Sequence, residues 1–70
     1  MKETFIPKSS TIDEVVYDGD EQKMVITFKD GRSYEYSAVP QSVYMQMQRA
    51  PSAGSFFARQ VKGRYNDTEL

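Results

Sequence analysis

The chain contains no cysteine, no histidine and no tryptophan. It therefore cannot form a disulfide, and it lacks the usual ligands of a structural zinc site. Nucleophilic catalysis through a Ser–His or Cys–His pair is excluded for the same reason. No apolar run approaches the roughly 20 residues of a membrane span, and the start of the chain lacks the apolar stretch of a signal peptide. We therefore expect a cytoplasmic protein that neither enters a membrane nor acts as an enzyme.

The net charge of −1 argues against a protein that holds nucleic acid by bulk positive charge. The charges are unevenly distributed, however. Residues 1–35 carry eight acidic and five basic side chains. Residues 36–66, the acid-free segment, carry no acidic side chain and four basic ones: Arg49, Arg59, Lys62 and Arg64.

Two stretches have the composition of β-strands within a chain long enough for one domain. Residues 11–17 are rich in β-branched side chains. Residues 23–29 alternate between apolar and polar, with Met24, Ile26 and Phe28 on one face. A third strand is predicted after the turn at Gly31.

The length of that turn decides which face of the third strand is buried. A two-residue loop would put Tyr34 and Tyr36 on the polar face of the preceding strand. A three-residue loop, with Gly31 left-handed as a β-bulge, puts Tyr34 opposite Ile26 and Tyr36 opposite Met24. Because a slip of one residue exchanges the two faces of a strand, only the longer loop matches apolar with apolar, and we predict that register.

Two short helices are predicted after the strands. Pro40 suits the first turn of a helix, and Pro51 disfavours helical backbone at Ala50, so the first helix ends there. Ser52 is a good N-cap for a second helix, and Gly63 is a natural end for it.

The predicted fold class is α+β, with a three-stranded antiparallel meander followed by two short helices packed on one face. The domain is expected over residues 9–65. Residues 1–8 are expected to be a flexible lead-in, and residues 66–70 a frayed acidic tail.

Three acidic residues, Asp18, Asp20 and Glu21, cluster in the turn between the first two strands. Such a cluster could bind Mg²⁺ or Ca²⁺, but it lacks the spacing of a known calcium loop. Because clustered charges in loops are usually solvated, we predict a solvated turn, with no metal and no cofactor.

The pair Tyr34 and Tyr36 allows two interpretations. Two aromatic rings on one face of a sheet can stack nucleic-acid bases. The predicted register instead favours packing of both rings against the helices, with each hydroxyl reaching the edge of the core.

The start of the second helix and the bases after it form a candidate site for anions or nucleic acid. The N-cap Ser52 and the nearby Gly54 would offer backbone N–H groups, and Arg59, Lys62 and Arg64 would add positive charge. Arg59 and Lys62 are one helical turn apart and can share a face. The alternative is an ordinary capped helix with a solvated basic face.

The chain resembles the KTSC domain, a short module found at the C-terminus of some lysyl-tRNA synthetases and as a free-standing bacterial or phage protein. The resemblance covers about residues 9–65 and departs from the family pattern at Ala58, where the family often has Asn. The residues that carry it are Ser9-Ser10, Ile12, Tyr17-Asp18, Phe28, Gly31, Tyr34, Tyr36, Val39-Pro40, Tyr44, Ala50, Ser52, Gly54, Phe56-Phe57, Val61-Lys62-Gly63 and Tyr65.

The family's attachment to a tRNA synthetase implies RNA binding by association. We expect a binding module for nucleic acid, with RNA favoured. One alternative is a protein-interaction adaptor, perhaps phage-encoded, that adds a partner strand to an open sheet edge. The other is a binder of a small anion or nucleotide at the second helix. The oligomeric state stays open.

Overall fold

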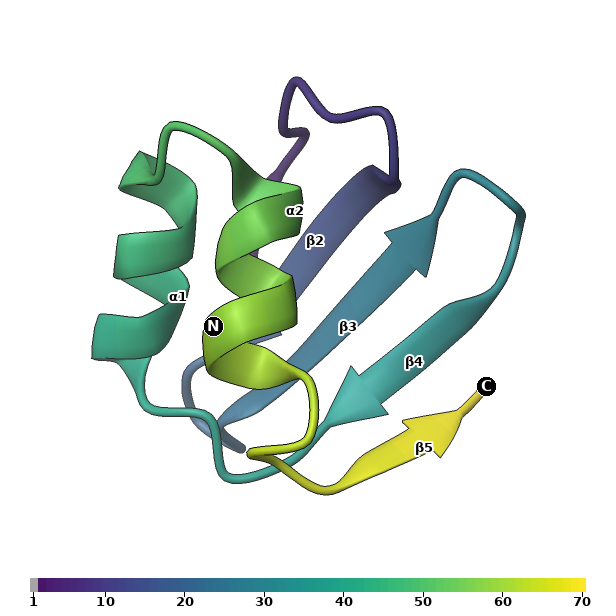
Figure 1. The fold of residues 1–70 in the computed structure, drawn as a ribbon. Coiled ribbons are helices and arrows are strands. Elements are labelled where there is room, and N and C mark those ends of the chain that lie inside the picture. Colours follow the sequence, from purple (N-terminus) through teal and green to yellow (C-terminus); the bar gives the residue numbers. More distant parts are fainter. Residues whose placement is uncertain (1) are drawn as a thin grey trace.

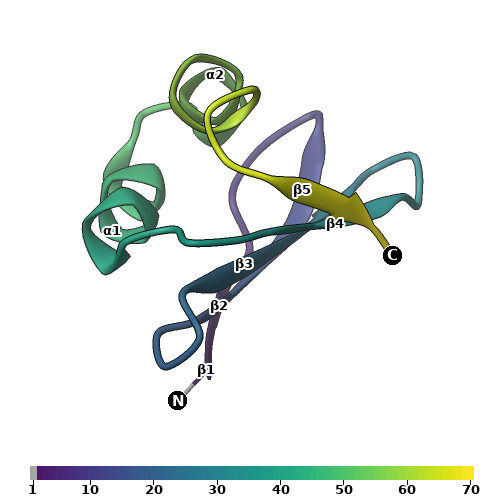
Figure 2. The same ribbon diagram turned by 90° about the horizontal axis from the view of Figure 1, so that it is seen from below.

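The computed structural model of the protein describes residues 2–70. One antiparallel sheet has the strand order β1-β2-β3-β4-β5, and both helices lie on the same face of it (Figures 1 and 2). The elements in chain order are β1 (Lys2–Phe5), β2 (Ile12–Asp18), β3 (Lys23–Phe28), β4 (Ser33–Tyr36), α1 (Gln41–Arg49), α2 (Ala53–Phe56), the π-helix η1 (Phe57–Val61) and β5 (Asp67–Glu69). The α+β class with two helices on an antiparallel sheet is confirmed.

The predicted count of three strands is wrong, because both ends of the chain add a strand. In the expected lead-in, whose residue 1 lies outside the described residues, Lys2–Phe5 pairs with β2. In the expected acidic tail, Asp67–Glu69 pairs with β4. Neither segment has the apolar alternation of a half-buried strand. Each instead satisfies the unpaired N–H and C=O groups that the central strands leave at the sheet edge.

The predicted hairpin register is confirmed. Met24 pairs with Tyr36 and Ile26 pairs with Tyr34. The N–H of Phe28 donates to the carbonyl of Arg32 at 2.8 Å, and Gly31 has a φ of 93°. This positive φ is accessible to glycine at little cost, so the turn residue fixes the face on which the tyrosines lie.

The core lies between the sheet and the two helices. Its buried side chains on β2 depend on a bulge, because the pairing with β3 shifts between Ile12 and Glu14. The extra residue allows Ile12 to face the helices together with Val15 and Tyr17. The buried apolar residues are Ile12, Val15, Tyr17, Met24, Ile26, Tyr36, Val39, Tyr44, Met47, Ala53, Phe56, Phe57 and Val61.

The helix boundaries follow the predicted signals. Pro40 caps α1, and α1 ends where Ala50 turns extended before Pro51. The Ser52 hydroxyl accepts a hydrogen bond from the N–H of Ser55 at 3.2 Å and so caps α2.

The sequence signals missed the π-turn that follows α2. The helix widens at Phe57, and the N–H of Lys62 donates to the Phe57 carbonyl, five residues back, at 2.9 Å. Gly63, with a φ of 80°, follows the end of this turn.

The sheet and the first helix are joined at Val39. Its N–H donates to the carbonyl of Gln22 at 2.8 Å, and its carbonyl accepts the hydroxyl of Tyr17 at 2.6 Å. Gln22 and Ala38 both have left-handed backbone, with φ of 55° and 58°. Within residues 2–70, no helix is long and apolar enough to span a bilayer.

Candidate nucleic-acid interface

A hollow of about 440 Å³ opens at the surface between η1 and the part of the sheet formed by β3, β4 and β5. We call it the sheet hollow. Its walls combine aromatic rings with four charged side chains. The lining residues are Thr11, Phe28, Asp30, Arg32, Tyr34, Tyr36, Gly54, Phe57, Ala58, Lys62 and Asp67.

The aromatic walls of the sheet hollow form a continuous chain of edge-to-face contacts. The ring of Phe28 meets Tyr34 at 5.9 Å and Phe57 at 5.3 Å between centroids. Phe57 in turn meets Tyr36 at 5.6 Å. Edge-to-face pairs of this kind stabilise a core beyond their buried area, so the rings are held in fixed positions.

The two tyrosines differ in what they can offer a ligand. Tyr36 is 3% exposed, so its ring has no open face on which a base could stack. Burial, with the nearby Asp67 and Tyr34, raises the pKa of Tyr36 to about 12, so its hydroxyl is neutral at physiological pH. Tyr34 is only half-buried and keeps part of its ring at the surface. The stacking role predicted as an option for both rings is therefore physically accessible to Tyr34 alone.

Four charges surround the sheet hollow, two of each sign. The Asp30 carboxylate is held by its own turn, where it accepts the Arg32 N–H at 2.9 Å and lies 4.0 Å from the Arg32 Nε. Lys62 and Asp67 form no ion pair with the described part of the chain. The hollow thus has an unpaired cation on the helix side and an unpaired carboxylate on the β5 side.

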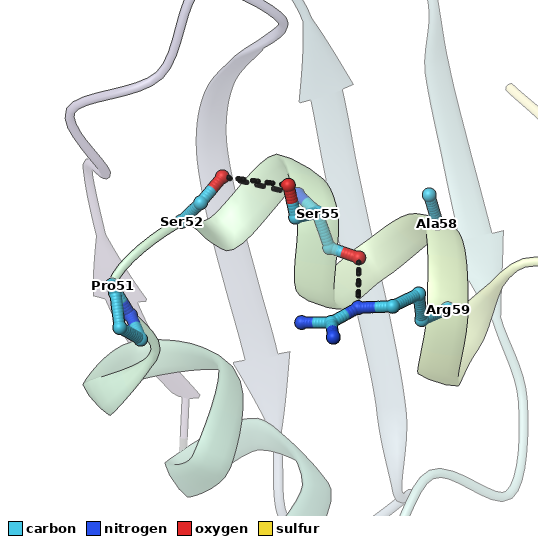
Figure 3. Close-up of a pocket in the computed structure, with 5 residues that line it drawn as sticks. All are labelled: Pro51, Ser52, Ser55, Ala58 and Arg59. Atoms are coloured by element: carbon cyan, nitrogen blue, oxygen red, sulfur yellow. Dashed lines mark hydrogen bonds between the residues drawn. The ribbon is translucent and has the colours of Figure 1, made fainter.

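A second hollow, of about 540 Å³, lies along α2 and η1 and shares Ala58 with the sheet hollow (Figure 3). We call it the helix hollow, and Pro51, Ser52, Ser55, Ala58 and Arg59 line it. The Arg59 Nε donates to the Ser55 carbonyl at 3.3 Å, which lays the side chain back along the helix, as Figure 3 shows. The terminal nitrogens of this guanidinium are exposed and available to an anion.

The predicted basic cluster is not confined to one hollow. Arg64, whose direction the sequence left open, donates from its Nε to the Arg59 carbonyl at 3.2 Å, which joins these two residues. Lys62 lines the sheet hollow and Arg59 the helix hollow, and the two hollows adjoin at Ala58, which lines both.

Ser52 and Gly54 already have structural roles. The Ser52 hydroxyl and carbonyl accept the N–H groups of Ser55 and Phe56. A side chain at Gly54 would meet the Ser9 hydroxyl at 3.5 Å, so the glycine lets the helix approach the β1–β2 loop. That hydroxyl is itself fixed, because it accepts the N–H of Thr11 and of Ile12.

The bases of the acid-free segment are not neutralised by the protein's own carboxylates. The ion pairs among residues 2–70 are Lys23–Glu35, Lys29–Asp13 and Arg32–Asp30, at 3.9 to 4.0 Å. All six partners precede the acid-free segment in the chain. Its four bases are therefore free to attract an external anion.

The acidic turn after β2 is organised by its own backbone. The Asp18 carboxylate accepts the N–H groups of Asp20 and Glu21 at 3.0 and 3.3 Å. Within residues 2–70, no group of three or more acidic, histidine or cysteine residues is placed to hold a metal ion.

Sequence reasoning missed seven of the eleven residues that line the sheet hollow, among them Phe28, Arg32 and Asp67. The predicted hairpin register already placed Phe28 opposite Arg32, which was the available signal for that wall. Asp67 gave no signal, because its position depends on the pairing of β5 with β4.

A family model, a solved structure and curated sequences all match the chain over nearly its whole length. The family model of the KTSC domain matches residues 8–65. A crystal structure of a KTSC domain protein from Yersinia pestis superimposes with a TM-score of 0.91 and 28% identity, over 100% of this chain and 99% of that one.

Among curated proteins, the chain is similar to lysine–tRNA ligases of cyanobacterial strains. It is 36% identical over 64 residues to that of Nostoc punctiforme and 34% identical over 64 residues to that of Trichormus variabilis. In both cases the match covers 91% of this chain and 11% of the ligase. The chain therefore spans a small part of the length of these relatives.

Proposed function

Because the chain belongs to the KTSC domain family, we propose that it is a non-enzymatic module that binds nucleic acid, with RNA as the ligand. The similar segment occurs in proteins named lysine–tRNA ligases, whose name makes tRNA their substrate, and this supports the choice of RNA. The family is one of small domains, and the chain has no histidine or cysteine with which a Ser–His or Cys–His pair could be built in either hollow.

The observation that carries the proposal is the set of unpaired cations on and around the second helix. Arg59 would contact a phosphate at the helix hollow, and Arg64, whose Nε donates to the Arg59 carbonyl, would contact the next phosphate from outside that hollow. Lys62 would contact a phosphate from the sheet-hollow side. The backbone N–H groups of Ser52 and Gly54 would add neutral hydrogen bonds, and the missing side chain of Gly54 lets the helix lie close to the β1–β2 loop. Tyr34 would supply the exposed edge of an aromatic surface.

The test is a titration with tRNA and with single-stranded RNA at two salt concentrations. Binding through phosphates releases counterions, so affinity must fall steeply as salt rises. Arg59→Gln should weaken binding to all sequences about equally and lower the salt dependence by about one released ion.

The matched control is Lys29→Gln. It removes one positive charge from a lysine that is paired with Asp13, outside the acid-free segment. The proposal requires a clearly smaller effect from this control than from Arg59→Gln. Equal effects, or no binding at low salt, would contradict it, and circular dichroism of each variant checks that the fold is kept.

The protein-adaptor alternative required open sheet edges, and the edges that the sequence predicted are paired in this fold. The edges that a three-stranded sheet would offer, on β2 and β4, are paired with β1 and β5. The new edge strands are four and three residues long, and short edge strands are poor templates for another chain. A pull-down that yields one stoichiometric protein partner and no RNA would favour this alternative.

The third candidate, a small anion at the start of α2, competes with the cap. Two N–H groups of the first turn are already bonded to Ser52. A thermal-shift screen with nucleotides tests it, because a ligand bound only to the folded state raises the midpoint.

A further inference from the structure

We propose that the sheet hollow takes one unstacked base of the bound RNA, and that Asp67 distinguishes cytosine from uracil there. This inference rests on the RNA binding proposed above. It assigns sequence preference to a residue outside the basic cluster, whose phosphate contacts would carry no sequence information.

The hollow has the shape and chemistry of a site for a flat aromatic group. At about 440 Å³ it falls within the roughly 300–1,000 Å³ typical of small-ligand pockets. Phe28 and Tyr34 form one wall and are only half-buried, so a base can reach their rings. Ala58, with its small side chain, lies on the helix side and leaves the entrance open. Stacking of a base on such rings depends little on its sequence.

Cations flank the hollow on both sides. Lys62 lies on the helix side without an ion pair among the described residues, and Arg32 lies on the hairpin side. A strand that places one base between them would bring the phosphates before and after that base close to a positive charge. This arrangement is complementary to a nucleotide and not to an uncharged apolar ligand.

Asp67 is the residue that a purely phosphate-binding surface does not explain. Its pairing opposite Tyr36 turns it to the same face as that ring, and it lines the hollow. Asp67 itself is exposed, and its negative charge is close enough to add to the effect of burial in raising the pKa of Tyr36. Near phosphates this charge is unfavourable unless it receives a hydrogen bond.

A carboxylate accepts hydrogen bonds and cannot donate them. The 4-amino group of cytosine is a donor that Asp and Glu recognise, whereas uracil has a carbonyl oxygen at that position, which the carboxylate repels. Where the base presents its 4-position to Asp67, the carboxylate therefore favours cytosine over uracil.

The experiment compares short oligo-rC with oligo-rU of equal length at low salt and pH 7.5. The unchanged chain should bind oligo-rC about fivefold more tightly or better, the lower end of base discrimination by a good hydrogen-bonding side chain. Asp67→Asn should abolish the ratio, because the amide both donates and accepts, while binding to oligo-rU is kept or slightly strengthened.

Glu69→Gln is the matched control. It makes the same charge change on the same strand at a residue that does not line the hollow, so the ratio should be retained. In a second measurement, NMR signals of the Tyr34 ring and the Ala58 methyl should shift when oligo-rC is added.

The outcomes separate the two proposals. Equal affinity for the two oligonucleotides, or a ratio that survives Asp67→Asn, overturns the base site while RNA binding stands. Failure of both oligonucleotides and of tRNA to bind at low salt overturns both proposals.

Discussion

Two aromatic clusters lie on the same face of the sheet, and their rings are buried to different extents. The closed cluster consists of Phe5, Tyr17 and Tyr44. Tyr17 and Tyr44 stack with centroids 4.8 Å apart and planes 11° apart, and Phe5 meets Tyr44 edge-on at 5.7 Å. Tyr17 and Tyr44 are at most 1% exposed. Phe5 is partly buried at the edge of the cluster, and the two stacked tyrosine rings leave no surface for a ligand.

The open cluster consists of Phe28, Tyr34, Tyr36 and Phe57, and two of its four rings are only half-buried. The nine-residue helix α1 and the strand β1 supply rings to the closed cluster, whereas the continuous segment α2–η1, also nine residues long, covers the open one. The covering segments are equally long, so the clusters differ in how far their rings are buried: Tyr17 and Tyr44 are closed off, whereas Phe28 and Tyr34 line a hollow.

The largest effect is expected from Tyr44→Ala in the closed cluster. The change removes a buried ring and should lower the free energy of unfolding by about 3–5 kcal/mol, a large part of the stability of so small a domain. Urea denaturation measures the loss. Tyr44→Phe, which keeps the ring, is the control and should cost far less. If Tyr44→Ala lowers the free energy of unfolding no more than Tyr34→Ala does, the two clusters do not differ in their contribution to stability.

Alkaline pH should produce the next effect, in both clusters. Burial raises the pKa of Tyr17, Tyr44 and Tyr36, and the pKa of Tyr36 reaches about 12. The unfolded chain loses these protons near pH 10. Stability is therefore complete below pH 10 and falls as pH rises from 10 through 12.

Urea midpoints between pH 8 and 12, the range about the tyrosine pKa values, measure this fall. Tyr36→Phe should remove the share of this loss of stability that comes from Tyr36 and leave the share that comes from Tyr17 and Tyr44. If Tyr36→Phe unfolds over the same pH range with an unchanged slope, the burial of the Tyr36 hydroxyl has been misjudged.

A smaller loss is expected from Tyr17→Phe. The variant keeps the stacked ring but leaves the Val39 carbonyl without its hydrogen bond, which should cost about 1–3 kcal/mol. Thermal denaturation measures it. Amide exchange at Val39, whose N–H holds Gln22, should accelerate in the same variant. An unchanged melting temperature would show that the link at Val39 does not need this bond.

The smallest loss is expected from Tyr34→Ala in the open cluster. A half-buried ring contributes about half of a full burial, so the free energy of unfolding should fall by about 1 kcal/mol. The RNA affinity should fall with it, because the exposed wall of the sheet hollow is removed. A loss of unfolding free energy as large as that of Tyr44→Ala, with unchanged RNA affinity, would contradict the role of the open cluster in binding.

Much of the fold could be predicted from the sequence. The hairpin register followed from Gly31 and the spacing of Tyr34 and Tyr36, because only one register matches apolar faces. The cap at Ser52 followed from side-chain chemistry, and Pro40, predicted for the first turn, is the residue directly before it. The resemblance to the KTSC domain is confirmed by the family model.

The edge strands could not be predicted from their own residues. Lys2–Phe5 and Asp67–Glu69 pair because β2 and β4 present unpaired backbone N–H and C=O groups. The candidate site was predicted as individual residues and not as an arrangement. Arg59 and Lys62 were expected on one face, and they line two adjoining hollows. The π-turn has no clear side-chain signal, since Phe57 and Val61 would be buried on a regular helix as well.

The π-turn also acts as a spacer of one residue between the second helix and the last strand. Deleting the exposed Gln60 would let the helix rewind with regular α geometry. The chain beyond it would be one residue short, and a slip of β5 by one position would bring Thr68 opposite Tyr36 in place of Asp67. The hollow would then present a hydroxyl group, so one residue of helix length sets the charge that a ligand meets at the far edge of the sheet.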